Sequence, residues 1–247
     1  MASLAPDTPA DSNDLHEIVA HSVLAGLCPL VPIPFLDDWL RDALRRRLIG
    51  RLAQARAVPL DADALTALAN GYQPATAQGC VQGCLRSAIT LPARFVFKLV
   101  FKKILRKLVI PLAIKDCVDT FSTGFHEAYL VRHGFRLGTV GATDRAAVLP
   151  LRYAAEQVRD EIDPRLVERF AGRAFRGSRR MLSTTARAIS RRLMRRRRDG
   201  TLDADAAADE MWNEEPPLDG MVDELATEIG NEAGYLRDLE RRLERRL

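Results

Sequence analysis

Residues 14–56 read DLHEIVAHSVLAGLCPLVPIPFLDDWLRDALRRRLIGRLAQAR, and this stretch decides the fold. Its first half repeats apolar side chains at helical spacing, and its second half repeats them among arginines. Three prolines stand between the halves, and each removes a backbone donor and disfavours α geometry in the residue before it. The stretch therefore predicts two helices joined by a tight turn. The expected turn residues are Pro29, Pro32, Pro34 and Asp37.

The segment from Ile18 to Leu36 contains no Asp, Glu, Lys or Arg. A helix that spans a bilayer needs about 20 predominantly apolar residues, so the length of this segment raises the question of membrane insertion. The prolines argue against a straight span. A re-entrant or interfacial hairpin and a fully buried hairpin in a soluble core both fit the pattern.

The order of small and apolar residues, then Pro32-Ile33-Pro34, then Asp37 at the start of the next helix, is similar to a known family. Residues 14–56 resemble the GTPase-associated, membrane-linked helical-hairpin domain family of unknown function (YcjF-like). Phe35 stands where such hairpins often have Gly, and the chain contains no phosphate-binding loop. The resemblance therefore implies membrane association rather than GTPase activity.

The composition predicts an all-α protein, because 47% of the residues are apolar, only 6% are aromatic, and Ala, Leu and Arg dominate. We expect a multi-helix bundle with the proline-broken helical hairpin and a long Arg-rich helix. The predicted divisions are a disordered leader (1–13), a helical core (14–140), an Arg-rich helical region (141–200) and an acidic helical segment (201–247). The first residues lack the features of a secretory signal, which predicts a cytoplasmic protein with reduced cysteines.

A basic amphipathic helix is predicted between Pro92 and Pro111, where cationic residues recur every four positions among phenylalanines and aliphatic residues. An apolar helix with one cationic stripe is typical of peptides that lie in an anionic membrane surface. The same pattern also fits a helix of a soluble core whose lysines are solvated, or a helix captured by a calmodulin-like partner. The candidate residues for binding anionic lipid are Arg94, Lys98, Lys102, Lys103, Arg106 and Lys107.

Opposite charges follow one another in the C-terminal third of the chain. Residues 165–198 carry thirteen arginines, whereas residues 201–232 carry eleven carboxylates and no Lys or Arg. Arginine forks match phosphates and carboxylates alike, so this helix is expected to bind a polyanion or the acidic segment, within one chain or between two chains. The residues expected to do so are Arg191, Arg192, Arg195, Arg196, Arg197 and Arg198.

Catalytic and metal sites have little support in the sequence. Asp119, His126 and His133 are seven residues apart and share one helix face with Asp116 nearby, yet no matching second helix supplies further ligands. We recognise no nucleotide loop, nucleophile elbow or Cys/His motif. The sequence therefore predicts no catalytic residue, no metal and no cofactor, although residues brought together only by folding leave enzymatic activity open.

These patterns predict a non-enzymatic adaptor or scaffold that is associated with a membrane surface and binds anionic lipid through basic amphipathic helices. The composition is typical of a bacterial protein, so the expected location is the cytoplasm, peripheral at the inner membrane. A soluble helical module for protein–protein interaction or self-assembly is the alternative. A nucleic-acid-binding protein is the third interpretation.

Overall fold

The computed structural model describes residues 9–30, 36–70, 93–140, 144–201, 203–213 and 218–247. The all-α prediction is confirmed, since these ranges contain helices and no strand. The elements are α1 (Pro9–Leu27), the 3-10 turn η1 (Cys28–Leu30), α2 (Leu36–Ala55), α3 (Ala62–Asn70), α5 (Ala93–Arg136), α6 (Arg145–Glu161), α7 (Arg165–Gly177), α8 (Arg179–Arg198), α9 (Ala204–Asn213), α10 (Asp219–Gly230) and α11 (Ala233–Glu244).

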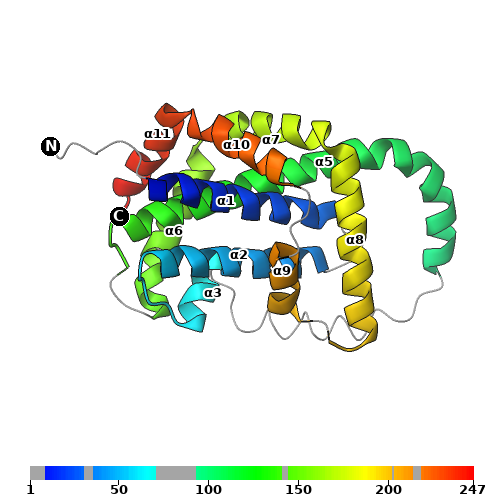
Figure 1. The fold of residues 1–247 in the computed structure, drawn as a ribbon, viewed down its shortest axis with the longest axis horizontal. Helices are drawn as coiled ribbons and strands as arrows, with labels where there is room; N and C mark the ends of the chain where they lie inside the picture. The colour runs from blue at the N-terminus through cyan, green and yellow to red at the C-terminus, as the bar shows by residue number, and fades with distance from the viewer. Residues whose placement is uncertain (1–8, 31–35, 71–92, 141–143, 202, 214–217) are drawn as a thin grey trace.

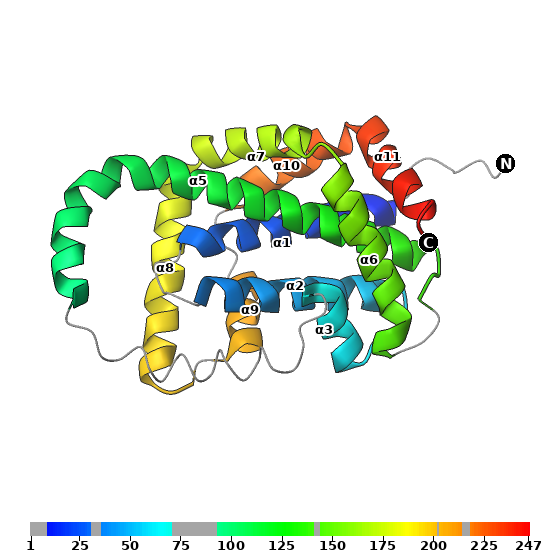
Figure 2. The same cartoon turned by 180° about the vertical axis from the view of Figure 1, so that it is seen from behind.

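The long helix α5 is the centre of the bundle (Figure 1). Helices α1, α2, α6, α7 and α11 all pack against it. Helix α8 stands across one end of the bundle, whereas α11 lies at the other end, as the two opposite views show (Figures 1 and 2).

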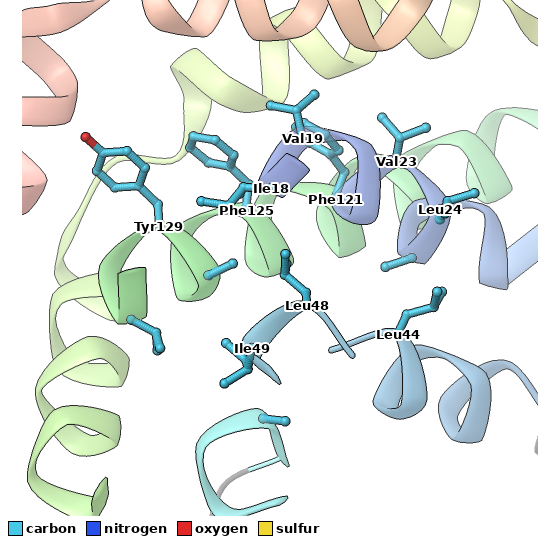
Figure 3. Close-up of a cluster of buried hydrophobic side chains, with 14 of the residues drawn as sticks. Ile18, Val19, Val23, Leu24, Leu44, Leu48, Ile49, Phe121, Phe125 and Tyr129 are labelled. Carbon is cyan, nitrogen blue, oxygen red and sulfur yellow. The ribbon is translucent and has the colours of Figure 1, made fainter. Parts of the chain in front are cut away.

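The core lies where α1, α2 and α5 meet (Figure 3). Helix α5 contributes aromatic rings to it, among them Phe121 and Phe125, whose ring centroids are 6.2 Å apart. Phe175 of α7 meets the Phe121 ring edge-on at 5.9 Å, and all three rings are completely buried. Aliphatic side chains of the neighbouring helices surround the rings, namely Ile18, Val19, Val23, Leu24, Leu44, Leu48 and Ile49.

A buried ion pair joins the first two helices to α5. The Asp14 carboxylate lies in the interior, where it accepts a hydrogen bond of 3.0 Å from Nε of Arg132 and another from Arg56. Helix α1 begins at Pro9, so Asp14 lies inside the helix, where its side chain binds Arg132 of α5. Residues 9–13, which are predicted to lie in the disordered leader, belong to α1.

The segment predicted as one long Arg-rich helix is divided in the structure, and the C-terminal stretch also contains a break. The Arg-rich stretch breaks at Ser178, where α7 ends and α8 turns away from it (Figure 1). Gly177 and Ser178 are weak helix formers, and the break lets the apolar faces of both helices reach the bundle. The C-terminal stretch breaks likewise at Asn231 and Glu232, between α10 and α11. The predicted Arg-rich helix is present as α8, but it does not continue through residues 165–177, which form the separate helix α7.

The predicted hairpin turn is described in part. Pro29 lies in η1, and Asp37 lies in the first turn of α2. Pro32 and Pro34 lie outside the described residues. Pro111 does not end its helix, because α5 runs through it, and the N-terminal part of α5 curves away from the bundle (Figure 2). None of the described helices has the length and apolar character needed to cross a bilayer.

The substitution Asp14→Asn tests the buried ion pair. It removes the carboxylate charge that Arg132, whose side chain is only 4% exposed, contacts in the interior, and so weakens a buried ion pair. We expect the free energy of unfolding, measured in urea, to fall by about 3 kcal/mol. The matched control is Asp38→Asn, which removes an ion pair with Arg41 at the surface and should change stability by less than about 0.5 kcal/mol. Equal losses in the two variants would contradict this role of Asp14.

The substitution Gly26→Ala tests the close approach of α1 to α5. A Cβ at Gly26 would lie 3.0 Å from the backbone oxygen of Cys117 and 3.1 Å from the Phe175 ring. Because both contacts are closer than ordinary van der Waals distances, the neighbouring atoms must shift, and we expect the variant to lose about 1–3 kcal/mol of unfolding free energy. Gly220→Ala in α10 is the control, since nothing lies within 4 Å of its Cβ position. An unchanged stability of the Gly26 variant would show that the two helices separate easily.

Candidate anionic-surface site

Helix α8 has one apolar face and one basic face. Leu182, Ile189 and Leu193 are buried against the end of the bundle. The helix contains no Asp or Glu, so its arginines are not neutralised from within the helix. Of the six arginines predicted for polyanion binding, four are exposed, Arg196 is half-buried, and the side chain of Arg197 lies outside the described residues. The exposed four are Arg191, Arg192, Arg195 and Arg198.

An apolar side chain interrupts the basic face. Met194 is 45% exposed, and its spacing places it among Arg187, Arg191, Arg195 and Arg198 on one side of α8. A guanidinium can bind a phosphate with two parallel hydrogen bonds, while a methionine gains by leaving water. This face therefore combines guanidinium groups, which can bind lipid phosphates, with an apolar side chain, which can enter the acyl region.

The predicted binding segments lie at the same end of the molecule. The turn η1 contacts both α5 and α8. The N-terminal part of α5 leaves the bundle beside this end (Figures 1 and 2). It contains the residues predicted to bind anionic lipid, Arg94, Lys98, Lys102, Lys103, Arg106 and Lys107, whose side chains lie outside the described residues. The fold thus brings together three helical segments that the sequence identifies separately.

The acidic segment meets basic residues of its own chain, mainly outside α8. Asp205 of α9 pairs with Arg46 at 2.9 Å, and Asp209 pairs with Arg47. Glu228 of α10 pairs with Arg173 of α7 at 2.8 Å. The arginines of α2 are the partners that sequence reasoning missed. The run of three arginines at residues 45–47 could have revealed them.

Trp212 strengthens the contact between α9 and the bundle. Its ring stacks on His21 of α1, with centroids 3.8 Å apart and planes inclined by 21°. The guanidinium of Arg51 in α2 lies 5.2 Å from the indole centroid, within the range of a cation–π contact. Helix α9 is therefore held by two ion pairs, one aromatic residue and the buried side chains of Ala207, Ala208 and Met211.

The polar stripe that the sequence identifies on α5 is a docking face for α11. The Tyr235 hydroxyl donates to Nε2 of His126 at 2.6 Å, while Nδ1 of the same ring donates to the Ser122 carbonyl. Nε2 of His133 lies 3.0 Å from the Glu244 carboxylate. Asp116 and Asp119 are exposed. Across the described part of the chain, no group of three or more His, Cys, Asp or Glu is arranged to hold a metal ion.

A second buried charge cluster ties α2 and α6 to α5. The Glu127 carboxylate, 6% exposed, contacts Arg45 at 3.5 Å, Arg152 at 3.4 Å, and Arg159. Arg152 also donates to the Leu68 carbonyl at the end of α3, at 2.9 Å. The cavity beside this cluster measures about 20 Å³, which is room for about one water molecule. Its size suits structural packing rather than substrate binding.

Burial keeps the side chains of Cys117, His126 and His21 in their uncharged forms near pH 7. Burial raises the pKa of Cys117 to about 12, so this thiol stays protonated. Burial lowers the pKa of His126 to about 4, although the hydrogen bond to the Ser122 carbonyl opposes the shift. Burial likewise lowers the pKa of His21 to about 3. Both histidines are neutral near pH 7, and their contacts are structural.

The chain matches no family model, and neither the curated proteins nor the solved structures contain a match to it. The resemblance to the helical-hairpin family stays a prediction.

The neutral state of His126 makes stability depend on pH. The unfolded chain binds a proton at this residue below about pH 6.5, whereas the folded chain does so only near pH 4, so stability falls as the pH falls between these values. The slope for one such group is about 1.4 kcal/mol per pH unit. Urea unfolding between pH 6.5 and 5 should therefore show a shallower loss of stability in His126→Gln than in the unmodified protein. Equal slopes would mean that His126 is protonated in the fold.

Proposed function

We propose that this protein is a non-enzymatic adaptor that binds an anionic membrane surface through one end of its helical bundle. The observation that carries the proposal is the exposed face of α8, where Arg187, Arg191, Arg195 and Arg198 surround Met194. The basic part of α5 and the turn η1 lie at the same end, and both belong to segments whose sequences favour contact with a membrane.

The energetics of such a surface are additive and sensitive to salt. Each Lys or Arg held near an anionic leaflet contributes about 1 kcal/mol, and this contribution fades within a Debye length of about 8 Å at physiological salt. A single helix face with four guanidinium groups is therefore enough for a measurable affinity, and a second basic segment beside it raises that affinity further. An exposed methionine adds apolar burial, which salt does not weaken.

Co-sedimentation with lipid vesicles tests the proposal. Vesicles with about one third anionic lipid should bind the protein, neutral vesicles should not, and high salt should weaken the binding. The variant Arg191→Glu/Arg195→Glu/Arg198→Glu should bind at least about tenfold more weakly, because three attractive charges become repulsive. The variant Lys98→Glu/Lys102→Glu/Lys107→Glu tests α5 in the same way.

A matched control separates a local site from net charge. Arg237→Glu/Arg241→Glu/Arg245→Glu makes the same change of charge on exposed residues of the α11 end, away from α8 (Figure 1). It should change vesicle binding less than about twofold, since these residues lie far beyond a Debye length from a surface at α8. Equal losses in the α8 and α11 variants, or no binding by the unmodified protein, would contradict the proposal. Tighter binding to duplex DNA than to vesicles would favour a nucleic-acid-binding protein.

A further inference from the structure

A groove of about 770 Å³ runs along α2 beneath α9. The α2 side of the groove is basic and polar, with Arg46, Arg47, Arg51 and Gln54. The α9 side presents Asp205 and Asp209. This groove is distinct from the exposed face of α8, since no residue of α8 lines it.

Helix α9 forms one wall of the groove and packs on α1 and α2 through a pattern of three side chains. Asp205 and Asp209 are four residues apart, and Trp212 follows three residues later, so all three lie on one side of the helix. Each meets its own acceptor site: Arg46, Arg47, and the pair formed by His21 and Arg51. The surface of α1 and α2 beneath α9 therefore binds two carboxylates and one aromatic ring, each at a defined position along a helix.

The ion pairs that bind α9 to α2 are weak, so another helix can compete with α9 for the same face. The helix is ten residues long, which is shorter than helices that are stable alone in water. Asp205 and Asp209 are 69% and 55% exposed, and ion pairs this exposed contribute at most about 1 kcal/mol each. Its packing is confined mainly to α2, with a smaller contact to α1. Among the described residues of α9, the buried apolar side chains are Ala207, Ala208 and Met211, and two of these three are small.

We propose that the face of α1 and α2 beneath α9, at the edge of this groove, is a docking site for an acidic helix of a partner protein, and that α9 covers this face when the partner is absent. The partner helix carries two carboxylates one turn apart and an aromatic residue almost one turn further, as α9 does. Its carboxylates pair with Arg46 and Arg47, and its ring takes the place of Trp212 against His21 and Arg51. The proposal concerns α1, α2 and α9 only, so it stands independently of membrane binding by α8.

The chemistry of the groove favours a helix over a phosphate surface. The contact at His21 and Arg51 is made for a flat ring, which a layer of phosphates does not supply. Glu17 also lines the groove and pairs with Arg51, so a dense negative surface meets a like charge there. A helix with two discrete carboxylates avoids that repulsion.

Helix α9 competes with a free helix at an advantage, because α9 is joined to its site by the chain. A segment joined to its site by short connections acts at an effective concentration in the millimolar range, so a free helix of equal quality binds poorly while α9 is in place. Disabling α9 should therefore raise the affinity for a helix added in solution. The natural partner must offer more contacts than α9 does, or must act when α9 is displaced.

The test measures binding of a fluorescent peptide with the sequence of residues 202–215 to the full-length chain by anisotropy. The variant Asp205→Ala/Asp209→Ala/Trp212→Ala, with α9 disabled, should bind the peptide at least about tenfold more tightly than the unmodified protein. Adding Arg46→Glu/Arg47→Glu should remove this gain. A peptide with Lys at positions 205 and 209 should not bind. An unchanged affinity of the disabled variant, or binding that survives Arg46→Glu/Arg47→Glu, would overturn the proposal.

Two further arms keep the result decisive. The variant Asp205→Asn/Asp209→Asn retains Trp212 and the apolar contacts of α9, so it should fold like the unmodified protein. Its affinity for the peptide should still rise about threefold. An unchanged affinity in this variant would overturn the proposal even if the triple variant is unstable. Anionic vesicles replace the peptide in the second arm. A gain in vesicle binding without a gain in peptide binding would identify the groove as a phosphate site and would also overturn the proposal.

Discussion

The packing of α1 against α5 is the constraint on which the rest of the structure depends. At one end of this contact Gly26 lets the helix backbones come together beside Cys117 and Phe175. At the other end the Asp14 carboxylate binds Arg132, which is buried in α5. The apolar contact sets the distance between the helices and the ion pair sets their register, because a buried charge tolerates no partner other than the intended one. Helices α2, α7 and α10 then add to a surface that is already defined.

Charge plays two different roles in this protein. Inside the bundle, Glu127 of α5 gathers arginines of α2 and α6. Asp14 of α1 binds Arg132 of α5 and Arg56, which follows α2. At the surface, α8 keeps its arginines on the side away from the bundle and has no carboxylate of its own. Arginine thus stabilises the fold where a carboxylate is buried beside it. On α8, where the helix contains no carboxylate, arginine forms a basic surface.

The sequence predicts the helical class and several helix limits well, because apolar periodicity and caps act locally. Asp61 caps α3 through the Ala64 amide at 2.6 Å, and Asp144 caps α6 in the same way. Breaks such as Ser178 are harder to predict, since they follow from where Phe175 and Leu182 find the core. The contacts of α9 were beyond prediction for a similar reason: Trp212 and His21 are far apart in the chain, and only the folded bundle brings them together. Side chains of the predicted lipid-binding helix lie outside the described residues, so that part of the site stays a prediction.

The crossing of α8 over the end of the bundle has a consequence for orientation. Helix α8 passes across the ends of α1 and α2 and does not run along them (Figure 1). A surface that receives the face of α8 flat would leave the bundle standing upright, with its axis along the surface normal. At 1.5 Å per residue, the 19 residues of α1 alone span about 28 Å. The α11 end would then project into solution beyond the reach of the lipid headgroups, free to meet a second macromolecule.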